Sequence, residues 1–233
     1  KDRRRDYTYI NRLIAIEEEL RRGRSEDDVA KDFNIKPHTL VRDRWVYGLI
    51  LKAIDRSKSE SGASLRLIDF EQHQEKLREL HRDYSKLAAT DADAAERLLQ
   101  SRLAMLLLDY SKTSLRLAEE DFYRRYLEPR LPDGLKPQLE VAEPVSVPGI
   151  PGATLPAQST DSASVEALTG RLLRAKALAN GGGSGSSGEI AEASAVMKEA
   201  RGSFDTAVKL AGQNAELVKR QTAVPERLTD AAD

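Results

Sequence analysis

The chain has 233 residues, enough for one large or two small domains; with 32% charged and only 5% aromatic residues, its composition is typical of helical proteins and excludes an all-β fold. The net charge is -1, so the chain is not a general polyanion binder, and any contact with nucleic acid must be local. The absence of cysteine excludes a disulfide framework, thiol catalysis and cysteine-ligated metals, and is compatible with a reducing cytosol.

Residues 1–60 are the most basic part of the chain, with 15 Lys and Arg against 12 Asp and Glu. Apolar residues at helical spacing predict three helices there, over 6–22, 25–33 and 37–56. Asn34 tolerates the left-handed backbone conformation that a sharp turn between two helices requires. We therefore predict a trihelical N-terminal unit.

The most specific signal is the stretch from Asp28 to Asp43, which has the spacing of a helix-turn-helix. Its inward-facing positions are filled by small or apolar residues, namely Val29, Ala30, Phe33, Ile35 and Leu40. The pattern resembles the lac-repressor type of unit, in which an Asp-Val-Ala opening and a Thr-Val in the second helix recur. Asp43 departs from it, because an apolar residue is usual there. We expect Trp45 and Val46 to supply that contact, or the second helix to adopt a different angle.

The wider resemblance is to the central DNA-binding region of ParB-like partition proteins. There a helix leads into a stretch of the form Gly-Arg-Ser-Glu-Asp-Asp-Val-Ala, here Gly23 to Ala30, and further helices follow, as they do here through residue 131. The Gly-Glu-Arg-Arg phosphate-binding motif and the nucleotide-binding domain of that family are missing, so CTP hydrolysis is not implied. The resemblance implies sequence-specific binding of double-stranded DNA in partition or transcription regulation, dimerisation, and residence in the cytoplasm at the nucleoid.

The resemblance also places the first half of the third helix, the recognition helix, in a major groove. The residues expected to contact DNA there are Lys36, Pro37, His38, Thr39, Val41 and Arg42. Arg42 is the most informative, because its planar fork can bond guanine O6 and N7 together. Arg44 and the run Arg3, Arg4 and Arg5 are expected to touch phosphates, which position the protein without specifying sequence.

Residues 61–131 predict a helical bundle that completes the DNA-binding domain, with helices over 69–88, 91–109 and 111–128. Thr90 is expected to cap the middle helix, and the run 102–108 is apolar on most faces, which indicates a helix buried on several sides.

Residues 132–160 hold six prolines and three glycines, which predicts a linker. Beyond it, helices over 162–179 and 189–222 predict a hairpin within residues 161–233, interrupted by the Gly/Ser tract 181–188. That tract is either natural low complexity or a designed loop replacement. The alanine-rich hairpin can bury little apolar surface alone, so we expect it to form a homodimer or to bind another protein.

For several residue groups, a functional interpretation is less favoured than a structural or surface role. His73 and His81 lie too far apart along a helix for one metal, so a solvated charged face is favoured. The acidic run 119–121 is expected at the surface, and Phe122 with Tyr126 is expected to anchor a helix end rather than to stack on bases. No catalytic triad, P-loop or dinucleotide fingerprint occurs, so we expect no enzymatic activity, cofactor or metal.

No apolar run approaches the roughly 20 residues of a membrane helix, so we expect a soluble chain without a membrane partner. Because it starts at Lys1 without an initiator Met, we expect it to be part of a longer protein. Two functions remain open: a DNA-binding protein that reads an operator-like site, and an all-α adaptor or scaffold that binds other proteins and not DNA.

Overall fold

The computed structural model describes residues 8–137, 160–180 and 185–222, and every regular element in these residues is helical, which confirms the predicted all-α fold. In chain order the elements are α1 (Tyr9–Arg21), α2 (Glu26–Asp32), α3 (Pro37–Arg56), the 3-10 turn η1 (Leu67–His73), α4 (Gln74–Ala88), α5 (Ala92–Leu107), α6 (Lys112–Leu115), the π-helical turn η2 (Tyr123–Leu127), the 3-10 turn η3 (Glu128–Arg130), α7 (Thr160–Ala179) and α8 (Ser187–Thr222).

Local sequence signals set the ends of α2 and α3. The Ser25 Oγ accepts a hydrogen bond from the Asp28 N–H at 3.2 Å, which satisfies one of the free donors at the start of α2. Asn34 adopts the left-handed conformation with φ of 51°, and the next amide, Ile35 N–H, donates to the Ala30 carbonyl. Pro37 then opens α3, where its missing N–H costs nothing. The predicted turn between these two helices is confirmed.

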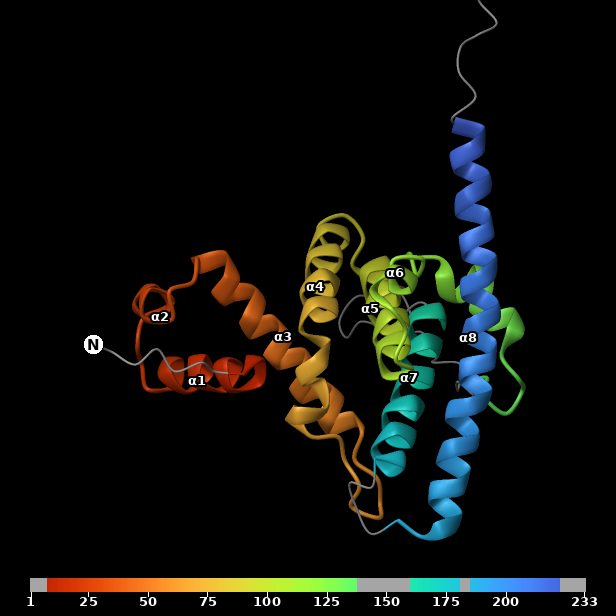
Figure 1. Cartoon of the computed structure of the whole chain (residues 1–233), viewed down its shortest axis with the longest axis horizontal. Helices are drawn as coiled ribbons and strands as arrows, with labels where there is room; N and C mark the ends of the chain where they lie inside the picture. Colours follow the sequence, from red (N-terminus) through yellow and green to blue (C-terminus); the bar gives the residue numbers. More distant parts are fainter. Residues whose placement is uncertain (1–7, 138–159, 181–184, 223–233) are drawn as a thin grey trace, which may run out of the picture.

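Two hydrophobic cores lie along α3. A small core inside the N-terminal unit contains Ile16, Val29 and Leu40. The large core takes in Val46 and Ile50 from the second half of α3, together with residues of all the longer helices that follow. Figure 1 shows the consequence: α1 and α2 form one end of the molecule, and α3 runs from that end into the bundle. The single helix α3 is therefore shared by the N-terminal unit and the main core.

The centre of the bundle is α5, which packs between α4 and α7. Every residue from 98 to 108 is buried, so the predicted helix with neighbours on several sides is confirmed. The two C-terminal helices pack as an antiparallel pair, with α7 against α5 and α8 against α7 and η2 (Figure 1). The pair belongs to the same core as residues 61–131.

The alanine-rich face of α8 is covered by the chain itself. Its buried alanines are Ala193, Ala200, Ala207 and Ala211. Phe204 lies among them, fully buried, with its ring 6.2 Å from that of Phe122 and 6.3 Å from that of Tyr110. Because this face already has a partner within the chain, its composition gives no reason to expect a second copy there.

The single helix predicted over 111–128 is wrong. The chain forms the short α6, an irregular turn, and then η2 and η3. In a continuous helix the Ala118 carbonyl would accept from the Phe122 N–H, but it accepts from Arg102 Nε at 3.0 Å, while Phe122 N–H donates to Glu119. Arg102 is a buried guanidinium and needs these acceptors, which include Asp83 at 2.6 Å.

Smaller differences have equally local causes. Asp91, not Thr90, caps α5, since its carboxylate accepts from the Ala94 N–H at 2.9 Å. The predicted linker begins later than expected, because Leu135 is still buried in the core; residues 138–159 lie outside the described part of the chain. His73 is 6% exposed rather than solvated, and this burial lowers its pKa.

Two further predictions are confirmed, one for surface residues and one for a buried ring. The acidic run 119–121 is exposed, and Phe122 is buried in the core with its ring 6.2 Å from that of Tyr126. Among the described helices, none combines the length and the apolar character that crossing a bilayer requires.

Candidate nucleic-acid interface

The start of α3 presents several side chains to solvent. Lys36, Pro37, His38 and Val41 are exposed, and Val41 shows 54% of its surface. The next turn of this face carries Arg44, while Thr39 is half-buried. The side chains of Lys36 and His38 form no hydrogen bond or ion pair with any described residue. Lys36 and His38 can therefore meet a partner without first breaking an internal contact, whereas Arg44 is paired with Glu26.

Arg42 is engaged differently. Its Nε and Nη2 both donate to Asp43 Oδ1, at 3.1 and 3.0 Å. Arg12 of α1 donates from Nη2 to the other carboxylate oxygen at 2.9 Å, and Asp43 is completely buried. Arg42, which was expected to read a base, thus has one edge of its fork occupied within the chain.

Asp43 itself explains the departure from the usual pattern. A buried carboxylate stands where an apolar residue is expected, and it is stabilised there because guanidinium groups bond both of its oxygens. The expectation that Trp45 and Val46 would replace it is wrong: Val46 lies in the large core, and Trp45 packs on the rings of Tyr84 and His81. Asp43 links α1 to α3.

A second link holds α1 against the bundle. The Glu71 carboxylate accepts from the N–H groups of Tyr9 and Ile10, at 2.7 and 3.0 Å, and so caps the start of α1 from another element. The Tyr9 ring lies 5.5 Å from each of the guanidinium groups of Arg12 and Arg78, and burial raises its pKa to about 12. These contacts fix the N-terminal unit relative to α4.

Sequence reasoning missed Glu71, Arg12 and the role of Asp43. Arg12 lies 31 residues from Asp43, and Glu71 lies 62 residues from Tyr9, so no periodicity joins these pairs. The one available signal was the carboxylate at position 43, because a charged residue at an inward position requires a partner of opposite charge.

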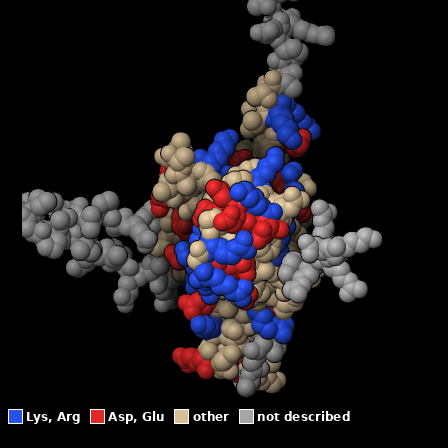
Figure 2. All heavy atoms as spheres, turned by 90° about the vertical axis from the view of Figure 1, so that its left-hand side faces the viewer, with Lys and Arg blue, Asp and Glu red and all other residues tan. Residues whose placement is uncertain are grey.

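The charge of this end of the molecule is mixed. Figure 2 shows Lys and Arg interleaved with Asp and Glu on the face that carries the N-terminal unit. Residues 8–57 contain ten Lys and Arg against nine Asp and Glu. Arg44 pairs with Glu26, whose neighbours in the first turn of α2 are Asp27 and Asp28. Arg3, Arg4 and Arg5, the expected phosphate contacts, lie outside the described residues.

Within the described ranges, no group of three or more His, Asp or Glu residues lies close enough together to hold a metal ion. No known protein family model, curated protein or solved structure matches the chain.

Proposed function

We propose that the chain binds double-stranded DNA sequence-specifically through α2 and α3, as a ParB-like partition protein or a transcription regulator at the nucleoid in the cytoplasm. The observation that carries this proposal is the exposed start of α3. Lys36, His38 and Val41 stand there without internal polar partners, directly after the left-handed turn at Asn34. In helix-turn-helix proteins, this part of the second helix meets base edges.

The proposed roles differ from residue to residue. His38 is suited to hydrogen-bond a base edge, and Val41 can contact the methyl group of thymine. Lys36, just before the helix, can meet a phosphate. Arg42 is a positioning residue, because its pair with Asp43 holds the angle of α3 against α1.

The test enriches random duplex DNA on the purified chain and measures variants on the enriched sequence. Replacing His38 or Val41 with Ala should cost about 1–3 kcal/mol on that sequence and less on random DNA, because base contacts carry the specificity. Lys36→Ala should weaken both equally and lower the salt dependence.

Lys198→Ala is the matched control, since Lys198 is an exposed lysine of α8. If the purified chain enriches no DNA sequence at low salt, the DNA-binding proposal is wrong. Equal losses on both DNAs for His38→Ala and Val41→Ala would leave DNA binding without base reading by these residues.

A second candidate is an all-α adaptor that binds proteins, and the mixed charge of the N-terminal unit favours it. The acidic first turn of α2, with Glu26, Asp27 and Asp28, is electrostatically unfavourable next to a phosphate backbone. Val41 would then be an apolar contact to a protein partner. If the purified chain binds a protein partner but no DNA, and the Val41→Lys variant loses that binding, the result would support this alternative.

We also propose that the chain forms a homodimer, through the end of α8 rather than through its alanine face. Leu217 and Val218 are 57% and 49% exposed there. Two recognition helices would combine the discrimination of two half-sites.

Light scattering at tens of micromolar should therefore give the mass of a dimer, and replacing Leu217 and Val218 together with Lys should give a monomer. The control replaces the exposed Ala191 and Ala195, near the start of α8, with Lys and should stay dimeric. A monomeric parent chain contradicts this proposal.

A further inference from the structure

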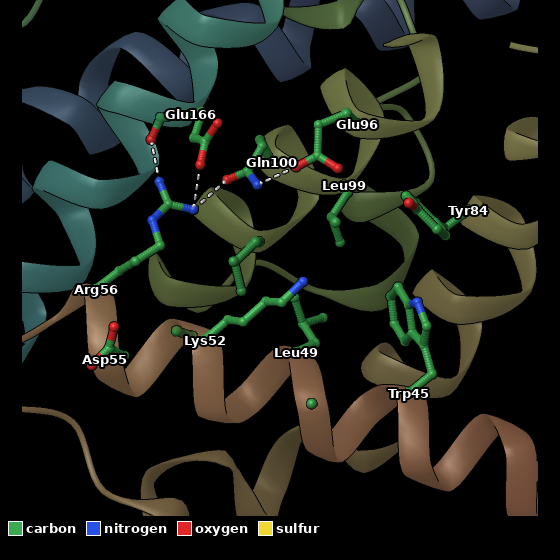
Figure 3. Close-up of a pocket in the computed structure, with 13 residues that line it drawn as sticks. Trp45, Leu49, Lys52, Asp55, Arg56, Tyr84, Glu96, Leu99, Gln100 and Glu166 are labelled. Atoms are coloured by element: carbon green, nitrogen blue, oxygen red, sulfur yellow. Dashed lines mark hydrogen bonds and ion pairs between the residues drawn. The ribbon is translucent and has the colours of Figure 1, made fainter. Parts of the chain in front are cut away.

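A cavity of about 390 Å³ lies between α3, α4, α5 and α7, in the size range of small-molecule sites. Figure 3 shows its walls. The second half of α3 forms the floor, and α5 lies opposite. The cavity is distinct from the exposed start of α3, but the same helix contributes to both.

One end of the cavity is aromatic and apolar. The rings of Trp45 and Tyr84 lie 5.2 Å apart, tilted by 40°, and both line the cavity. The adjoining walls are formed by leucines, namely Leu49, Leu99 and Leu103. A flat ring placed here would contact aromatic faces and bury apolar surface.

The opposite end is closed by polar groups that satisfy one another. Arg56 donates to the Glu166 carbonyl at 2.7 Å and to Gln100 Oε1 at 3.3 Å, and it pairs with the Glu166 carboxylate. Gln100 in turn donates to Glu96 Oε1 at 2.6 Å. These groups hold α7 and α5 against α3, and the Arg56 charge is already neutralised.

Lys52 is the exception. Its side chain extends from α3 into the cavity, between the aromatic end and Arg56 (Figure 3). It forms no hydrogen bond or ion pair with any residue that the structure describes. The cavity thus offers an unpaired ammonium beside an apolar, aromatic surface.

We infer that this cavity binds a small aromatic acid, whose ring packs against Trp45 and Tyr84 and whose carboxylate pairs with Lys52. Glu96, which lines the α5 side of the cavity, disfavours an anion there and so directs the acidic group to Lys52 on the α3 side. Because α3 carries the exposed residues of the N-terminal unit at its other end, occupancy of the cavity is suited to regulate the proposed DNA binding. That regulatory role rests on the proposed function, whereas binding of the acid does not.

Trp45 is the sole tryptophan of the chain and reports directly on the cavity. The probe is phenylacetate, with 2-phenylethanol and 2-phenylethylamine as uncharged and cationic analogues; at 295 nm excitation none of the three is excited. Phenylacetate should change the Trp45 emission saturably and more tightly than either analogue. Lys52→Met should weaken phenylacetate binding about tenfold and leave 2-phenylethanol unaffected, because it removes one charge-assisted contact. Lys198→Met, outside the cavity, should leave both unchanged.

The absence of a saturable response to phenylacetate up to about 10 mM overturns the inference. So does tighter binding of 2-phenylethylamine, which would make Glu96 the anchor, or equal binding of phenylacetate to the Lys52→Met protein. Since no DNA is present in these measurements, their failure leaves the DNA proposal standing, and a failure of DNA binding leaves them interpretable.

Discussion

Replacing Asp43 with Ala is expected to lower the free energy of unfolding by about 3 kcal/mol, near the lower end of the range for breaking a buried ion pair. The carboxylate is completely buried, and its loss leaves the guanidinium groups of Arg12 and Arg42 without their shared partner. Because these arginine side chains are about a quarter exposed, they regain some hydration, which keeps the loss below the upper end of that range. Urea unfolding, followed by circular dichroism, measures the effect.

Asp43→Asn separates the charge of Asp43 from its shape, and Glu26→Ala is an exposed control. Asp43→Asn keeps the side-chain volume and one acceptor oxygen, so the free energy of unfolding should fall by less than in Asp43→Ala, within about 1–3 kcal/mol. Glu26→Ala removes the exposed pair with Arg44 and should change stability by about 0–1 kcal/mol. If Asp43→Ala costs no more than Glu26→Ala, the carboxylate does not link α1 to α3.

The same variants bear on the role of Arg42. If this residue positions α3, Asp43→Asn should weaken binding of the enriched DNA although Asp43 is too deeply buried to touch DNA. If Arg42 reads a base, releasing it from Asp43 should instead leave binding intact or strengthen it.

The N-terminal unit could be predicted from the sequence because its determinants are local. The Ser25 cap, the turn at Asn34 and the opening of α3 at Pro37 each act within a few residues. The buried run around Leu103 could be predicted for the same reason, since a helix that is apolar on most faces must be covered by neighbours.

The remaining features depend on residues distant in the sequence. The break after α6 exists because Arg102 takes the Ala118 carbonyl, and helical periodicity does not contain that contact. The pairing of Arg42 with Asp43 could not be predicted, because Asp43 is also held in place by Arg12, a residue on another helix. At the candidate site, residue types and spacing predicted the helix whose start is exposed, α3. They did not predict that Arg42 and Arg44 on this helix are already paired with carboxylates.

The alanine-rich hairpin shows why composition alone misled. Few large apolar residues in α8 indicated a marginal structure that needs a partner, but Phe204 and the small residues around it allow α8 to approach η2 and α7 closely. Removing α7 and α8 would therefore remove part of the core and not an appendage, so a chain shortened in this way cannot serve to test self-association.

Replacing Phe204 with Ala should cost about 3–5 kcal/mol, because the ring is completely buried between those of Tyr110 and Phe122 and its loss leaves a cavity. Lys209→Ala, at an exposed position of the same helix, should stay within about 0.5 kcal/mol of the parent chain. The transition is followed by the fluorescence of Trp45, which lies on α3 and packs, partly buried, against the same core. Since one continuous core unfolds cooperatively, Phe204→Ala should shift the Trp45 transition as far as the loss of helix measured by circular dichroism. A shift confined to the circular dichroism signal would show that α8 unfolds separately from the core around α3.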